Sequence, residues 1–186
     1  MIKVLEKKIS GTLFKLIIAD ITKQSTQAIV NAANSSLMGG GGVDGAIHSA
    51  GGPEILKECK IIRKKQGKLP AGNSVLTTAG KLQSDYVIHT VGPIWRGGNN
   101  NEDEILANSY INSLRLASKN NIKSLSFPSI STGAYRFPKE RAAMIALQSI
   151  LSYIEIDDII KEVIMVLYSE KDYNIYYTAW EDMYNN

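Results

Sequence analysis

Apolar residues in this chain follow two spacings, one typical of strands and one typical of helices. Short runs rich in β-branched residues predict strands at Thr12–Ala19, Ala28–Asn31, Ser74–Thr78, Tyr86–Val91, Ser124–Ile130 and Glu162–Tyr168. Apolar residues at helical spacing predict helices from about Val43, over Pro53–Gln66, Glu102–Ser118 and Lys139–Tyr153, and from Lys171 to Met183. Strands that alternate with helices indicate an α/β domain with helices on both faces of its sheet.

Three segments that follow predicted strands carry most of the candidate chemistry. They are Ala19–Thr22, Asn31–Gly45 and Pro128–Tyr135. In open α/β sheets, ligands bind beyond the carboxyl ends of the strands. We therefore expect these segments to form the functional site. The cluster Asn99–Asn101 is expected to be an exposed loop instead.

Four consecutive glycines, Gly39–Gly42, suggest a loop that brings backbone N–H groups close to an anion. The helix predicted from about Val43 would add its positive dipole end. The small-residue turn Ser131–Tyr135 can form a second concave N–H site, so the two loops together suggest a diphosphate clamp. On this interpretation, valine at Gly41 or Gly42 would block the ligand. The alternatives are a flexible loop and an ordinary strand-to-helix turn.

Known nucleotide-binding motifs fit the glycines poorly. Gly40–Gly45 satisfies G-x-G-x-x-G, but the preceding strand is predicted to end near Asn31, too far away for a dinucleotide fingerprint. A P-loop is also disfavoured, because no Gly-Lys-Ser/Thr follows.

The candidate side chains also have ordinary structural interpretations. Asp44 could stabilise a helix start, Asn34 could be a turn residue, and Asp20 could be a cap or turn residue. The two histidines, His48 and His89, have no cysteine pair and no nucleophile at a recognisable spacing. We therefore expect neither a metal nor a cofactor.

Composition and charge narrow the class of protein. The 186 residues suit a single domain over 1–186, and the net charge of +3 is spread out. The basic stretch Lys57–Lys68 indicates a solvated helix face more than a nucleic-acid patch, because no aromatic residues are interleaved with it. The lone Cys59, the absence of a signal-peptide pattern and the short apolar runs lead us to expect a cytoplasmic monomer that does not contact membranes.

In the three segments that follow the predicted strands, the sequence resembles MacroD-type macrodomains. The resemblance is carried by Asn31–His48, by Ile130–Tyr135 followed by Pro138, and by Asp20–Thr22 and His89–Trp95. It extends over nearly the whole chain, and the Asn31–His48 run is highly specific. The resemblance implies a three-layer α/β/α fold with a mixed, mainly parallel six-stranded sheet. It also implies ADP-ribose as ligand, with no required metal.

The resemblance further implies an enzyme that deacetylates O-acetyl-ADP-ribose and removes ADP-ribose from acidic side chains of mono-ADP-ribosylated proteins. Asp20 would receive the adenine amino group, Ile21 would donate backbone contacts, and Tyr168 could stack on adenine. Asn34 would hold the distal ribose, and Asp44 would orient or deprotonate the attacking water. The remaining substrate-binding residues would be Asn31, Gly41, Gly42, Val43, Ser131, Thr132, Gly133, Ala134 and Tyr135.

Two departures from the family pattern stand beside these loops. Ala19 replaces a glycine that usually precedes the aspartate, and Arg136 occupies a position that is often glycine. Arg136 could contact a phosphate or point into solvent. The competing functions are a non-catalytic ADP-ribose reader, which would lack Asn34 and Asp44, and an ADP-ribose-1″-phosphate phosphatase. Nucleic-acid binding has only the mild positive charge in its favour.

Overall fold

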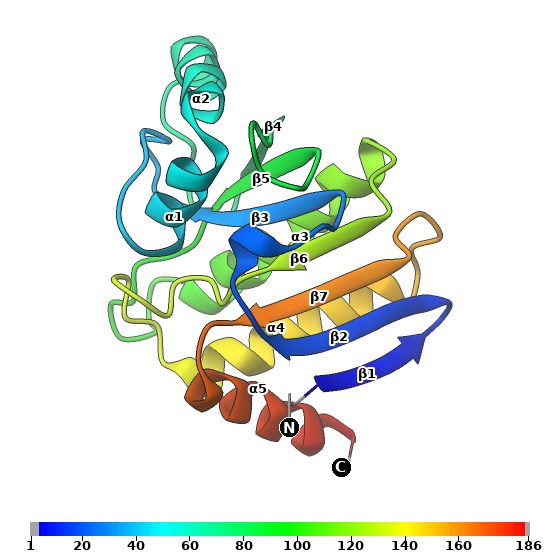
Figure 1. Ribbon diagram of the computed structural model, residues 1–186. Coiled ribbons are helices and arrows are strands. Elements are labelled where there is room, and N and C mark those ends of the chain that lie inside the picture. The colour runs from blue at the N-terminus through cyan, green and yellow to red at the C-terminus, as the bar shows by residue number, and fades with distance from the viewer. Residues whose placement is uncertain (1–3, 185–186) are drawn as a thin grey trace.

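A computed structural model describes residues 4–184 and contains a seven-stranded sheet in the order β1-β2-β7-β6-β3-β5-β4. The central pairings from β2 to β5 are parallel, whereas β1 and β4 pair antiparallel at the two edges (Figure 1). The mixed, mainly parallel sheet is therefore confirmed. The strands are β1 (Val4–Ile9), β2 (Thr12–Ile18), β3 (Ala28–Ala33), β4 (Ser74–Thr78), β5 (Tyr86–Val91), β6 (Ser124–Phe127) and β7 (Glu162–Leu167).

The expectation of six strands was wrong, because β1 adds a seventh at the edge. It pairs with β2 through a tight turn in which Ser10 and Gly11 both have positive φ, at 47° and 96°. Such turns match the twist of a hairpin. The strand is mostly exposed and carries Lys7 and Lys8, which discourage further pairing at an open edge. Because of its polar residues, β1 does not stand out in the sequence as an apolar run.

Helices cover both faces of the sheet, as expected for a three-layer α/β/α domain. The helices are α1 (Gly42–Gly51), α2 (Pro53–Gln66), α3 (Glu102–Lys119), α4 (Lys139–Ile154) and α5 (Glu170–Tyr184), with a short 3-10 helix η1 (Ile21–Lys23) after β2. Each long helix lies within about one residue of its predicted bounds. The strand predicted to reach Ile130 ends at Phe127 instead, because Pro128 has no backbone N–H for the ladder.

The strand β7 shows how the two layers of core are divided. Val163, Met165 and Leu167 point into the cluster that contains residues of α3, α4 and α5. Ile164 and Val166 point into the opposite cluster, which contains residues of α1 and α2. Because alternate residues of a strand face opposite sides, a strand buried on both faces is apolar throughout. In Figure 1, α4 lies behind β7 and β2.

The parallel strands place their carboxyl ends at one edge of the sheet. The segments that follow β2, β3, β5, β6 and β7 therefore meet there, together with the start of α1. Asn99–Asn101 is an exposed segment before α3, as expected. Among the described residues, no helix is both long enough and apolar enough to cross a membrane.

Candidate active site

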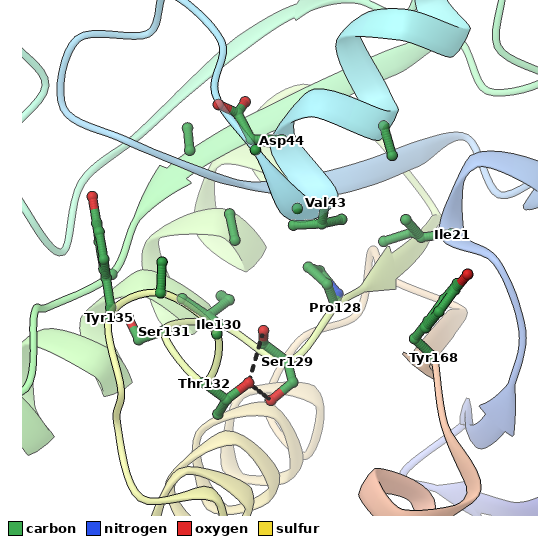
Figure 2. Close-up of a pocket in the computed structure, with 18 of the residues that line it drawn as sticks. Ile21, Val43, Asp44, Pro128, Ser129, Ile130, Ser131, Thr132, Tyr135 and Tyr168 are labelled. Carbon is green, nitrogen blue, oxygen red and sulfur yellow. Dashed lines mark hydrogen bonds between the residues drawn. The ribbon is translucent and has the colours of Figure 1, made fainter.

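A cleft of about 830 Å³ lies beyond the carboxyl ends of the strands. In Figure 2, Ile21 and Tyr168 lie on one side of it and Tyr135 on the other, with Asp44 and Val43 above the loop that contains Ser129. Nearly all the residues singled out from the sequence line this cleft. They are Asp20, Ile21, Asn34, Gly41, Gly42, Val43, Asp44, Ser131, Thr132, Gly133, Ala134, Tyr135 and Tyr168.

The loop after β6 offers a row of backbone donors. Its fold is held by N–H groups of Arg136 and Phe137, which donate to the carbonyls of Gly133 (2.9 Å) and Ser131 (3.0 Å). The backbone N–H groups of Thr132–Tyr135 donate to no acceptor among the described residues. Consecutive free N–H groups in a turn form a concave site for an anion. The floor of the cleft therefore suits a phosphate.

Buried hydroxyl groups support this loop from below. Ser129 Oγ is 2.8 Å from Thr132 Oγ1 and 2.9 Å from the Tyr176 hydroxyl. The Tyr110 hydroxyl accepts a hydrogen bond from the Ile130 N–H at 3.1 Å. Burial raises the pKa of Tyr110 well above its ordinary value and that of Tyr176 to about 12, so both hydroxyls keep their protons. These hydrogen bonds hold the loop against the underlying helices α3 and α5.

The start of α1 provides a second set of donors. Gly41 and Gly42 are exposed, and a Cβ added to either would meet nothing within 4 Å. Their N–H groups and that of Val43 donate to no acceptor in the described part of the chain. Free N–H groups at a helix N-terminus favour an anion through hydrogen bonding and the helix dipole. Two donor sets from separate loops therefore line one cleft.

Asp44 directly follows these donors in the chain. It lies in the first turn of α1 and is 5% exposed. Its Oδ1 accepts a hydrogen bond from Asn31 Nδ2 at 2.7 Å and lies 3.4 Å from His48 Nε2. A Cβ added to Gly40 would lie 3.1 Å from Asp44 Oδ2 and 3.2 Å from Asn34 Nδ2. The two predicted catalytic side chains thus flank the same glycine.

Asn34 and Tyr135 complete this end of the cleft. Asn34 is half-buried, and its Nδ2 donates to the Gly39 carbonyl at 2.9 Å while its Oδ1 accepts from the Ser36 N–H at 2.9 Å. Partial burial and the negative charge of Asp44 raise the pKa of Tyr135. Tyr135 therefore presents a protonated hydroxyl that can donate a hydrogen bond.

Asn31 does not line the cleft, contrary to its expected role in substrate binding. It is fully buried in β3, where its side chain contacts Asp44 and His89. The alternation of a strand explains this placement, because Asn31 points into the layer between the sheet and α1. Asn31 is linked to the cleft through its hydrogen bond to Asp44.

The opposite end of the cleft is formed by Asp20 and Tyr168. Asp20 caps η1, and its Oδ1 accepts from the Thr22 N–H (2.8 Å) and hydroxyl (2.7 Å). These bonds lower the pKa of Asp20 below its ordinary value. The capping interpretation is therefore confirmed, yet Oδ2 accepts no hydrogen bond from the described residues and remains available to a ligand. Tyr168 is 85% exposed at the cleft edge.

Several residues that line the cleft were not singled out from the sequence, among them Asp172 and Gly92. Asp172 lines it at the start of α5, where it forms an ion pair with Lys139 and exchanges hydrogen bonds with Ser169. The Ser-x-x-Asp spacing is a capping box that could have marked this helix start. Gly92 also lines the cleft, and a Cβ there would clash with Ser131 Oγ. No local pattern reveals that contact.

The fold assembles one group of potential metal ligands within residues 4–184. Atoms of His48, Cys59 and His89 lie within 4.8 Å of one another. Burial and the nearby charges of Asp44 and Glu58 raise the pKa of the Cys59 thiol to about 12. Both ring nitrogens of His89 also have protein partners. A protonated thiol and an occupied imidazole do not favour a metal.

Arg136 follows the donor loop but is not among the residues that line the cleft. Its side chain is exposed, and its backbone is left-handed, with φ at 57°. That conformation is one that glycine adopts without strain. The arrangement favours the solvent-facing alternative for Arg136.

Comparisons with known proteins agree with this geometry. A macro domain-containing protein of Caldanaerobacter subterraneus is 60% identical, covering 91% of this chain and 96% of its own length. An O-acetyl-ADP-ribose deacetylase of Escherichia coli K12 is 48% identical, covering 89% and 93%. The Oceanobacillus iheyensis macrodomain, solved as a glycine-to-valine variant with ADPR, superposes with a TM-score of 0.95 at 43% identity, covering 99% and 100%.

Other solved variants of the Oceanobacillus iheyensis protein replace an aspartate and an asparagine ten positions before it. The glycine lies three positions before that aspartate. The same spacings here lead from Asp44 to Asn34 and Gly41. The macro domain model itself matches residues 30–146. Together with the fold and the cleft, these matches show that the chain belongs to the macrodomain family.

Proposed function

We propose that this protein binds ADP-ribose and hydrolyses ester bonds at its distal ribose. The observation that carries the proposal is the pairing of two free N–H rows with Asn34 and Asp44 in one cleft. Free backbone donors suit a diphosphate, and a buried carboxylate beside them suits hydrolysis. The substrates are O-acetyl-ADP-ribose and ADP-ribose attached to acidic side chains of proteins.

Adenine occupies the end of the cleft at Asp20 and Tyr168. A carboxylate only accepts hydrogen bonds, so Asp20 Oδ2 favours an exocyclic amino group over a carbonyl. The lowered pKa of Asp20 supports this role, because the carboxylate stays ionised at neutral and mildly acidic pH. Tyr168 offers an exposed aromatic face for stacking.

The distal ribose lies between Asn34, Asp44 and Tyr135. Asp44 orients and deprotonates a water molecule, and because a carboxylate is a weak base at neutral pH, positioning contributes as much as proton transfer. One water molecule is added across the ester C–O bond. The products are ADP-ribose and either acetate or the free carboxylic acid of the protein side chain. No step requires a metal.

Product analysis on three substrates tests the proposal. The purified protein is incubated separately with O-acetyl-ADP-ribose, with aspartyl- or glutamyl-ADP-ribosylated protein, and with ADP-ribose-1″-phosphate, each with and without a chelator. We expect ADP-ribose from the first two, at rates that the chelator does not change. Binding of ADP-ribose without hydrolysis of any substrate would indicate a reader. Hydrolysis of the phosphate ester alone would indicate a phosphatase.

A further inference from the structure

A continuous chain of buried polar side chains runs from β4 to Asp44. Thr77 Oγ1 is 2.9 Å from His89 Nε2, and His89 Nδ1 is 3.1 Å from Asn31 Nδ2. Asn31 Nδ2 is in turn 2.7 Å from Asp44 Oδ1. All four side chains are at least 95% buried. Of the four, only Asp44 lines the cleft.

The sheet fixes the geometry of this chain. Asn31 and His89 are register partners in the parallel pair of β3 and β5, and β4 pairs with β5 on its other side. Their side chains therefore leave the same face of the sheet at neighbouring positions. A change of one side chain leaves the backbone spacing of the others in place.

The donors and acceptors can be arranged in only one consistent order. The Asn31 amide nitrogen has two protons, one for Asp44 Oδ1 and one for His89 Nδ1. His89 Nδ1 must then accept, which places the ring proton on Nε2, facing Thr77 Oγ1. Thr77 donates its own proton to the Thr78 carbonyl at 3.0 Å. Burial lowers the pKa of His89 to about 3, so the ring is neutral, as this order requires.

The orientation of the Asn31 amide matters most for Asp44. A reversed amide would direct its oxygen at the carboxylate, and two acceptors would face each other. The observed orientation leaves Asn31 Oδ1 buried without a partner among the described residues. An orphaned acceptor of this kind is unfavourable. The contacts to Asp44 and His89 must therefore determine the orientation.

We infer that His89 and Thr77 are positioning residues for hydrolysis, because they set the orientation of the Asn31 amide that holds Asp44. The inference rests on the proposed function. Neither residue touches the substrate, so their loss should lower kcat and leave ADP-ribose affinity intact. Misplacing a reacting group by about 1 Å can reduce a rate about 100-fold, so the loss of a positioning contact should cost on the order of 10- to 100-fold in activity.

A matched pair of variants tests the inference. In His89→Asn the side-chain amide ends near the position of Nδ1 and can accept from Asn31. In His89→Gln the side-chain amide ends near the position of Nε2 and cannot accept from Asn31, although glutamine fills more of the space that histidine occupies. We expect His89→Gln to lower kcat at least about tenfold and His89→Asn to retain more activity. ADP-ribose affinity measured by calorimetry should change less than about twofold in both. A structural role would give the reverse order, because glutamine packs better.

Thr77 provides a second pair if the histidine variants do not fold. Thr77→Ser retains the hydroxyl group, so kcat should be unchanged. Thr77→Val retains the shape of the side chain but loses the hydroxyl group, so kcat should fall. Equal kcat in these two variants, or equal losses in the two histidine variants, would overturn the inference.

The tautomer of His89 in the wild type can be measured by ¹⁵N NMR, which does not depend on enzymatic activity. The spectrum should show the neutral Nε2–H tautomer, and an Nδ1–H tautomer would overturn the inference. Absence of hydrolysis by the wild type would instead overturn the proposed function.

Discussion

At the scale of single residues, some of the important side chains could be predicted from the sequence, whereas others, which lie behind the cleft, could not. Asn34, Asp44 and Asp20 lie in segments that follow apolar strands, and their roles were expected from the resemblance to macrodomains. His89 and Thr77 were not, because their link to Asp44 depends on strand register and on contacts between residues far apart in the chain. Asn31 was predicted to bind substrate, yet strand alternation buries it behind Asp44.

Asp20 tests adenine recognition. Asp20→Ala removes the acceptor and should weaken ADP-ribose binding by about 1–3 kcal/mol, typical of a lost hydrogen bond to a charged group. Calorimetry at neutral pH measures the change. Asp20→Asn is the matched control for the loss of the helix cap, since its amide oxygen can still accept from the Thr22 N–H at the start of η1. Unchanged affinity in a folded Asp20→Ala protein would exclude this role.

At the scale of elements, the glycine loop and the start of α1 decide what the cleft can hold. The helix start near Val43 and the free N–H groups could be anticipated from the glycines and the following helical pattern. The crowding that we expected around Gly41, in contrast, is not found in the structure. The structure leaves open space around a Cβ there, and a relative with valine at the corresponding spacing was solved with ADPR. The expectation that valine at Gly41 blocks the ligand therefore finds no support.

Gly40 is the glycine that lies beside both proposed catalytic side chains. A methyl group in Gly40→Ala would lie 3.1 Å from Asp44 Oδ2 and 3.2 Å from Asn34 Nδ2, so both side chains must shift. Because small displacements of reacting groups reduce rates strongly, we expect turnover of O-acetyl-ADP-ribose to fall at least about tenfold. Gly41→Ala is the matched control, because its methyl group meets nothing within 4 Å. Equal rates in the two variants would contradict this account.

At the scale of the whole molecule, the two core layers hold the loops that meet at the cleft. The alternation of strands and helices was sufficient to predict helices on both faces of the sheet, because a strand such as β7 is apolar on both faces. It was insufficient for β1, whose charged residues suit an exposed edge. The layer between the sheet and α1 also contains the polar chain around His89, which links global stability to the site.

That link predicts a pH dependence of stability. The pKa of His89 is about 3 in the folded protein, below its ordinary value of 6.5, so the unfolded chain binds more protons between these values. Stability should therefore decrease as pH falls from about 6.5 toward 3, by at most about 1.4 kcal/mol per pH unit from this residue. Urea unfolding at pH 7 and pH 5 measures the loss. The loss should be smaller in His89→Asn, and an equal loss would contradict a buried neutral His89.

The most direct test of the central claim is the rate of O-acetyl-ADP-ribose hydrolysis by the wild type and by Asp44→Ala. General-base and positioning effects each contribute about 10²- to 10⁴-fold in enzymes, so the variant should be at least about a hundredfold slower. Its affinity for ADP-ribose should change much less, because the two rows of N–H groups and Asp20 remain. Full activity in Asp44→Ala, or no wild-type hydrolysis above background, would contradict the account.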